Sequence, residues 1–303
     1  MLEFKGFNII KIRKWSYLLS AVIIVAGLAN IGIHKGLKMG IDFAGGNMIQ
    51  IEIKDREVTI SDVRNVLIGT GYGNNVQRID DPLRNLYILR TLVFEKNNDR
   101  IISEITDALR NRFGSENVVV EKVDIVGPRI SKYLLRTSYV VMLVAILLIL
   151  MYTSFRFRFR FGVTAIIALV HDVLVMVSFI SLFNKEMDTF ILAAILTIIG
   201  YSLNDTIVVF DRARENLKST KAYEDFEGTM NRSVLQSLSR TVITSVTTLI
   251  VVISLYIFGG SMMKNFAFAL IVGIISGTYS SIFIATALVV DWHRWKPEKV
   301  KKV

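Results

Sequence analysis

Six long, mainly apolar runs constrain the fold of this chain more than any other feature of its sequence. They lie at Trp15–Ile33, Leu134–Phe155, Gly162–Phe183, Phe190–Phe210, Leu238–Phe258 and Phe266–Trp292. A helix needs roughly 20 predominantly apolar residues to cross the hydrocarbon layer of a bilayer. The runs have about that length, and 52% of the 303 residues are hydrophobic. The sequence therefore predicts a polytopic α-helical membrane protein rather than a soluble domain.

The basic residues predict how the chain is inserted. The connections rich in Lys and Arg contain Arg156 and Arg160, then Arg212, Arg214 and Arg232, and finally Arg294 and Lys296. Cytoplasmic loops carry an excess of these residues, and six spans with both termini in the cytoplasm place all three sets on that side. The net charge of +10 is thus attributed to membrane insertion, and no nucleic-acid partner is expected.

These patterns divide the chain into four parts. Residues 1–33 form a cytoplasmic N-terminus and an uncleaved first span, because its apolar run is too long for a cleaved signal peptide. Residues 34–132 form a domain outside the cytoplasm, residues 133–293 form spans two to six, and residues 294–303 form a cytoplasmic tail. The polar, basic segment Glu215–Ser237 is expected to form a short helix along the inner surface, in contact with anionic lipid.

The segment 34–132 shows the patterns of a small α+β domain. Ile49, Ile51 and Ile53 alternate with polar residues, which is typical of a strand buried on one face. Further along, the patterns predict a helix after Thr59 and Ser61, either of which could cap it, and a second helix at 101–113. They also predict strands at 76–80 and 85–91 around a turn at 80–82, and a last strand at 117–126. The order β-α-β-β-α-β predicts a ferredoxin-like domain.

Asp205 is the residue most suggestive of chemistry. It lies about 15 residues into the fourth run, roughly 22 Å along a helix, and therefore within the hydrocarbon layer. A carboxylate there costs at least about 2.5–3.5 kcal/mol and normally faces a partner or a cavity. We interpret Asp205 as a proton-titrating group, with a structural hydrogen bond between helices as the alternative.

Arg240, near the start of the fifth run, is the candidate partner of Asp205. Both residues fall in the cytoplasmic half of the layer if the predicted topology holds. A nearby Arg favours an ionised carboxyl and desolvation favours a protonated one, so such a site can be switched by movement or water. The alternative is that Arg240 only anchors the helix at the interface.

Further polar residues in the layer form a second group of candidates. His171 and Asp172 lie near the middle of the third run, where they either join a proton relay or make structural hydrogen bonds. Asn204 and Thr244 lie beside the primary candidates. The last run carries a face of small residues that predicts a close helix interface, formed by Gly273, Ser276, Gly277, Thr278, Ser280 and Ser281.

Other kinds of site are not indicated. The absence of cysteine excludes disulfides and cysteine-ligated metals, and three isolated histidines make a metal site improbable. No phosphate-binding loop of the G-x-x-x-x-G-K-[ST] type occurs. We expect no cofactor and no enzymatic activity, with protons as the coupling ion. Gly40, Asp42, Phe43, Gly45 and Gly46 form a glycine-rich motif that, by itself, predicts only a tight turn into the outside domain.

Four stretches together resemble a known family. The glycine motif at 40–46, the pair His171-Asp172, the stretch Ile199–Arg214 and the stretch Ser239–Ser245 are similar to the SecF family of bacterial protein-export membrane subunits. The resemblance covers the whole chain. It implies an inner-membrane protein of RND-type architecture, in which a SecF subunit supplies half of a twelve-span unit and SecD the other half.

The resemblance also implies a mechanism. The complex assists the SecYEG channel by using the proton gradient to pull or release unfolded chains during translocation, and the family's proton-linked aspartate and arginine correspond to Asp205 and Arg240. Two alternatives are half of an RND-type small-molecule exporter and a non-conducting assembly scaffold. The small size of the outside domain disfavours the exporter. Exchanging the charges of Asp205 and Arg240 would distinguish a scaffold, which should regain function, from a proton carrier, which should stay impaired.

Overall fold

The computed structural model describes residues 8–55, 58–70, 76–79, 84–91, 98–157, 159–218 and 223–297. The chain divides into two compact units. The helical unit comprises Met1–Lys38, Val141–Glu186 and Phe190–Val303, and the sheet unit comprises Met39–Val140 with Met187–Thr189. Residues 187–189 belong to the sheet unit although they are far from its other residues in the sequence, and no sequence pattern predicted this.

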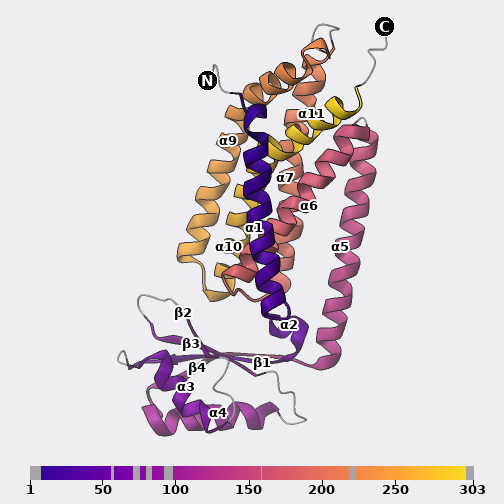
Figure 1. The fold of residues 1–303 in the computed structure, drawn as a ribbon. Helices are drawn as coiled ribbons and strands as arrows, with labels where there is room; N and C mark the ends of the chain where they lie inside the picture. Colours follow the sequence, from indigo (N-terminus) through magenta and orange to yellow (C-terminus); the bar gives the residue numbers. More distant parts are fainter. Residues whose placement is uncertain are drawn as a thin grey trace. The chain divides into compact units, whose positions relative to one another are not determined.

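Six helices of the described residues are long and apolar enough to cross a membrane, which confirms the predicted number of spans (Figure 1). They are α1 (Arg13–Ile33), α5 (Pro128–Arg156), α6 (Phe159–Leu182), α7 (Thr189–Asn216), α9 (Phe226–Phe258) and the sixth span, which consists of α10 (Ser261–Tyr279), the π-helical η3 (Ser280–Ala285) and α11 (Thr286–Trp295). A short 3₁₀ turn, η1 (Ile10–Ile12), precedes α1.

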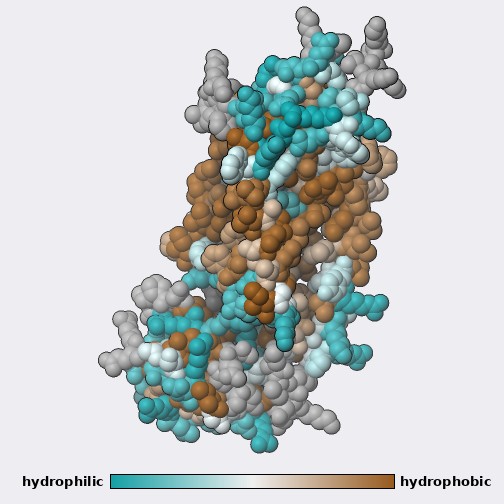
Figure 2. All heavy atoms as spheres, viewed as in Figure 1, coloured by the Kyte–Doolittle hydropathy of each residue, from teal (hydrophilic) through white to brown (hydrophobic). Residues whose placement is uncertain are grey.

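The surface of the helical unit is apolar along much of the length of its helices. Figure 2 shows hydrophobic residues covering the middle of these helices and hydrophilic residues gathered at the end where α11 lies. Large apolar side chains such as Val22 on α1, Leu143 on α5 and Ile250 on α9 are more than half exposed. Such a surface suits hydrocarbon or another membrane helix rather than water.

Small residues bring α7 and α10 close together. A Cβ added to Gly277 would lie 2.8 Å from the Cβ of Ser202, and one added to Gly273 would lie 2.4 Å from Cγ1 of Ile198. Larger residues at these two positions would force the helices apart, because packing is the main source of association between membrane helices. The predicted interface role of this small-residue face is confirmed.

The sixth span changes its winding just after this contact. Residues 280–285 adopt π-helical geometry between α10 and α11, and the hydroxyl of Thr286 donates to the carbonyl of Ser281 at 3.1 Å. A π-bulge within an α-helix commonly marks a functional position. Ser280, the first residue of this segment, is fully buried.

The sheet unit has a four-stranded antiparallel sheet in the order β2-β3-β1-β4. Its elements are α2 (Ile41–Ala44), β1 (Gly46–Ile53), α3 (Ile60–Ile68), β2 (Val76–Ile79), β3 (Leu86–Thr91), α4 (Asn98–Phe113) and β4 (Val118–Val126). This is the predicted β-α-β-β-α-β order, preceded by one extra helical turn at α2. The predicted turn at 80–82 lies outside the described residues.

The core of the sheet unit follows the periodicities of the sequence. Ile49, Ile51 and Ile53 are fully buried, and they pack with residues such as Val63 of α3 and Ile105 of α4. Of the two capping candidates, Thr59 rather than Ser61 caps α3: its hydroxyl accepts the backbone N–H of Asp62 at 3.3 Å, and Asp62 accepts the backbone N–H of Thr59 at 2.9 Å. Gly114 ends α4 with a φ of +91°.

One prediction about helices was wrong. A separate surface helix was predicted over 215–237, but residues 226–237 are the first turns of α9, which continues to Phe258. Buried side chains in these turns, including Met230 and Ser233, hold them within the helical unit. Residues 219–222 of the predicted helix lie outside the described residues.

Candidate functional site

Asp172 on α6 is the centre of a buried network of hydroxyl groups, which we call the Asp172 network. Its side chain is 1% exposed. The hydroxyls of Ser202 on α7 and Ser280 on η3 donate to Oδ2 at 2.6 and 2.8 Å, and the hydroxyl of Ser276 on α10 donates to Oδ1 at 2.7 Å. Three helical segments are thus joined to α6 through one carboxylate, which fits the rule that buried charges are fully hydrogen-bonded.

His171 extends this network to α1. Its Nδ1 lies 3.1 Å from Oδ1 of Asp172, and its Nε2 lies 2.8 Å from the hydroxyl of Ser20. The hydroxyl of Ser20 lies 3.5 Å from that of Tyr279, which in turn donates to the backbone carbonyl of Ser16 at 2.8 Å. The pair His171-Asp172 therefore connects α6 with α1, α7 and the sixth span.

A cavity of about 220 Å³ adjoins the network between α1, α6 and α10. Most of its lining is apolar, and its polar lining residues are Ser20, His171, Ser276 and Tyr279. All four belong to the hydrogen-bonded chain just described. The Asp172 network therefore borders an open space on one side, while its hydrogen bonds are all formed.

Asp205, also on α7, is in a different situation. It is 3% exposed, yet within the described residues its Oδ2 is a buried oxygen with no hydrogen-bond partner. Buried side-chain polar atoms usually have a partner, so each exception calls for an explanation. An unpartnered carboxylate oxygen can take up a proton or a water without first breaking a bond.

Hydrogen bonds between α7 and α9 show which residues of α9 lie at the same height along the helices as Asp205. The hydroxyl of Tyr201 donates to that of Thr248 at 3.2 Å, and Nε of Arg212 donates to Oε1 of Gln236 at 2.7 Å. The two helices are therefore antiparallel neighbours. With 201 beside 248, four residues along each helix bring Asp205 level with residue 244, and Arg240 lies one further turn along α9.

The predicted partnership of Asp205 with Arg240 is not a direct ion pair. Within the described residues, no oxygen of Asp205 lies within 4.0 Å of the Arg240 guanidinium, although the two groups interact electrostatically. Arg240 is exposed on the chain, as is Asn204. The hydroxyl of Thr244 donates to backbone carbonyls of its own helix at 3.1 and 2.9 Å, so it does not bond to Asp205.

The glycine motif makes a contact that the sequence did not indicate. Oδ2 of Asp42, on α2, accepts both the backbone N–H of Thr189 at 3.1 Å and its hydroxyl at 2.5 Å. Thr189 is the first residue of α7. The prediction that this motif forms only a turn was therefore incomplete, because two positions 147 residues apart meet here.

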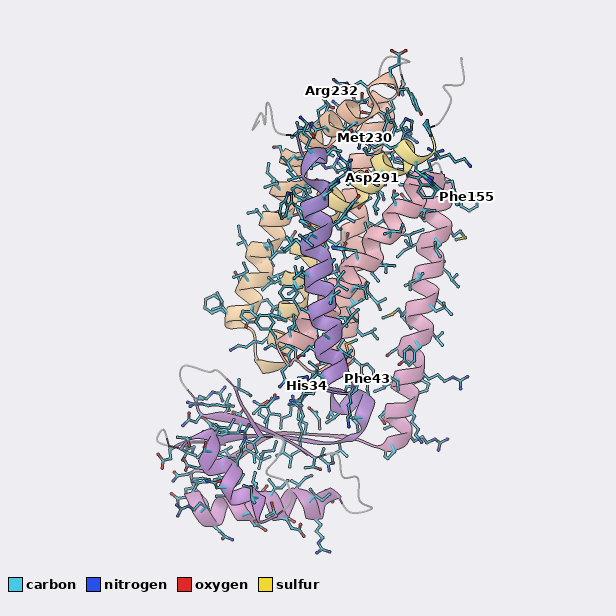
Figure 3. All side chains as sticks on the ribbon, viewed as in Figure 1. His34, Phe43, Phe155, Met230, Arg232 and Asp291 are labelled. Atoms are coloured by element: carbon cyan, nitrogen blue, oxygen red, sulfur yellow. The ribbon has the colours of Figure 1, made fainter. Side chains whose placement is uncertain are left out.

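Ion pairs gather the basic connections at one end of the helical unit. Arg13 of α1 pairs with Asp291 of α11 at 2.8 Å, and Arg294 pairs with Glu227 of α9. Figure 3 shows Asp291 at the same end of the unit as Arg232 and Met230. The connection after α5 reaches this end as well, since Arg156 pairs at 2.5 Å with Asp211 of α7, whose end also bonds to α9.

Sequence reasoning found Asp172, Asp205 and His171 but not the serine hydroxyls that donate to Asp172. Ser276 and Ser280 were assigned only to a packing face, and Ser20 and Ser202 were not singled out. A signal existed in the spacing of Ser276 and Ser280, because residues four apart lie on one face of a helix and present two hydroxyls to a neighbour.

The fold and the site define a class of protein first. The chain is a multi-pass membrane protein whose described residues include six helices long and apolar enough to cross a membrane, with polar groups buried between them and an α+β unit inserted after the first span. The sequence profile of the C-terminal part of protein export membrane proteins SecD/SecF matches residues 105–295, and the SecD/SecF GG motif matches residues 31–55. The chain belongs to the SecD/SecF family of protein export membrane proteins.

Individual relatives agree with this assignment. The chain is 39% identical to the protein translocase subunit SecF of Desulfurispirillum indicum, covering 100% of this chain and 97% of the relative. It is 40% identical to SecF of Rhodothermus marinus, covering 95% and 94%. These matches assign the chain to protein export rather than small-molecule export.

A solved structure is similar to the whole fold. The crystal structure of SecDF from Thermus thermophilus, described as a translocon-associated membrane protein, superposes with a TM-score of 0.82 at 33% identity. The match covers 97% of this chain but only 40% of that longer one.

Proposed function

We propose that this chain couples proton movement across the bacterial inner membrane to Sec-dependent protein export, with Asp205 as the proton-carrying group. The observation that carries the proposal is the buried, unpartnered Oδ2 of Asp205 beside α9. An ionisable residue inside a membrane is a functional candidate by default, and this one has an open acceptor.

The coupling step uses the electrostatics of α7 and α9. Ionised Asp205 is attracted by Arg240, one turn from its level on α9, and protonation removes that attraction. The two helices then reseat against each other. One elementary charge moved through 100 mV supplies about 2.3 kcal/mol, which exceeds the about 0.6 kcal/mol of an average hydrogen bond between membrane helices.

Exposed polar groups support a second membrane subunit as partner. Arg240 and Asn204 are exposed on this chain within apolar helices, where contact with lipid would be costly. A SecD subunit supplying the other spans of a SecDF-type assembly would cover them. In this proposal the assembly acts with SecYEG on unfolded translocating chains, and the basic end of the helical unit faces the cytoplasm and its anionic lipids.

The test uses vesicles containing the full chain, its SecD partner and SecYEG, with proton flux and export of a secretory precursor measured in parallel. Asp205→Asn keeps the shape of the side chain but cannot carry a proton at physiological pH. We expect this variant to insert and assemble normally, while export loses its dependence on the proton gradient. Asp211→Asn is the matched control, because Asp211 lies on the same helix and also has a buried oxygen without a hydrogen-bond partner in the described residues, whereas its other oxygen is paired with Arg156.

Normal gradient-driven export by Asp205→Asn would overturn the proposal. The scaffold alternative is examined by exchanging the two charges in one chain, Asp205→Arg together with Arg240→Asp. A structural pair would regain export in the exchanged variant, whereas a proton carrier stays impaired.

A further inference from the structure

The glycine motif holds the first residue of α7 by side-chain and backbone contacts. Asp42 accepts two hydrogen bonds from Thr189, one from its backbone N–H and one from its hydroxyl. The first N–H groups of a helix have no partner within the helix, and a carboxylate there also interacts favourably with the helix dipole. Asp42 thus caps α7 from a distant part of the sequence.

Backbone contacts next to Asp42 strengthen this hold. The N–H of Gly40 donates to the carbonyl of Met187 at 2.9 Å, and Met39 forms a parallel bridge with Met187. A Cβ on Gly40 would lie 3.2 Å from the Cβ of Asp188, so glycine permits this close approach. The motif therefore bonds to Met187, just before α7, and to Thr189, the first residue of α7.

The other end of the motif leads into the sheet. Gly45 has a φ of +76° and Gly46 a φ of +123°, backbone conformations that favour glycine. A Cβ on Gly45 would lie 3.3 Å from the hydroxyl of Ser131 on α5 and 3.4 Å from the carbonyl of Val126 at the end of β4. The seven residues 40–46 thus contact the start of α7, the first turn of α5 and two strands.

We propose that Asp42 is a positioning residue that transmits displacement of α7 to the sheet unit. Asp205 lies on the same continuous helix, roughly 24 Å along it from Thr189, so a shift of α7 at Asp205 moves the segment that Asp42 holds. This inference rests on the proposed proton coupling at Asp205. It adds the contact between Asp42 and Thr189, through which a displacement of α7 on protonation of Asp205 would move the sheet.

The first experiment measures proton flux and export together in vesicles of the full assembly. Asp42→Ala removes both hydrogen bonds that Thr189 donates to the carboxylate. Proton flux should stay near that of the unaltered chain, while export should fall about tenfold. Asp42→Asn keeps an acceptor oxygen and should recover much of the export. Thr189→Val removes only the hydroxyl and should have a smaller effect, and adding it to Asp42→Ala should cause little further loss, because the two residues act through one contact.

The second experiment controls for misfolding within a single variant. The chain has no cysteine, so Asp42→Cys combined with Thr189→Cys creates one possible cross-link. The reduced variant should conduct protons without driving export, and formation of the disulfide should restore export. Failure of the cross-link to form, or equal export before and after it forms, would overturn the inference.

Two outcomes separate this inference from the proposed function. Normal export by Asp42→Ala, or a parallel fall of flux and export, contradicts the role of Asp42 while leaving the role of Asp205 intact. Absence of proton flux through the unaltered assembly contradicts the proposed function itself.

Discussion

Asp172 and Asp205 are both buried acids of the helical unit, and their surroundings are opposite. Asp172 is held by hydroxyls from three other helical segments and lies beside His171, whereas Asp205 has a buried oxygen without a partner in the described part of the chain. Burial alone therefore does not identify a functional carboxylate. The difference lies in the donors: Asp172 accepts hydrogen bonds from neighbouring helical segments, whereas one oxygen of Asp205 has none, and the proposed proton-carrying role of Asp205 rests on that difference.

The largest expected effect comes from removing the bonded acid. Asp172→Ala leaves three serine hydroxyls and His171 without their acceptor. With about 0.6 kcal/mol for an average interhelical bond in a membrane, we expect a loss of about 2–3 kcal/mol in the free energy of unfolding. Denaturation of the purified chain in mixed detergent micelles measures this free energy of unfolding. Asp205→Asn is the comparison, and we expect it to lower the free energy of unfolding much less.

A stable Asp172→Ala chain that no longer conducts protons would reverse the assignment of the two acids. In that case the Asp172 network would be the conducting site, and the open oxygen of Asp205 would need another explanation.

A smaller effect is expected when one donor is removed. Ser276→Ala deletes one bond to Asp172 and should lower the free energy of unfolding by about 0.6 kcal/mol. The matched control is Thr241→Val on α9, since the hydroxyl of Thr241 is buried without a partner in the described residues. Valine has nearly the same shape, so this variant should be as stable as the original chain or slightly more stable. Equal losses in the two variants would show that the serine bond contributes nothing.

The smallest effect concerns a carboxylate outside the membrane. The hydroxyl and the backbone N–H of Thr59 donate to Asp62 and hold the pKa of its carboxyl below the ordinary value of 3.8. Because the folded-state pKa is lowered, Asp62 stabilises the sheet unit above the ordinary pKa, and this contribution disappears as the pH falls through the folded-state pKa.

A carboxyl-detected NMR titration of the full chain checks this direction. The midpoint of Asp62 should lie below 3.8 and should move toward that value in Thr59→Ala. An unchanged midpoint in Thr59→Ala would show that the capping hydroxyl does not cause the shift.

The sheet unit and the six spans were largely predictable because short-range patterns specify them. The alternation at Ile49, Ile51 and Ile53 indicates a strand whatever it pairs with, and a long apolar run must cross the bilayer as a helix. Where the pattern was ambiguous, as at 215–237, burial of residues such as Met230 decided in favour of a continuation of α9.

By itself, the sequence determined the spans, the order of elements in the sheet unit and the presence of acids inside the membrane, since these follow from hydrophobic periodicity and length. Only the tertiary structure decided which acid has donors and which does not, and that Asp42 holds the start of α7. Hydrogen bonds reach only about 3 Å, so their partners depend on which helix faces meet, and the residues that meet here are up to 278 positions apart.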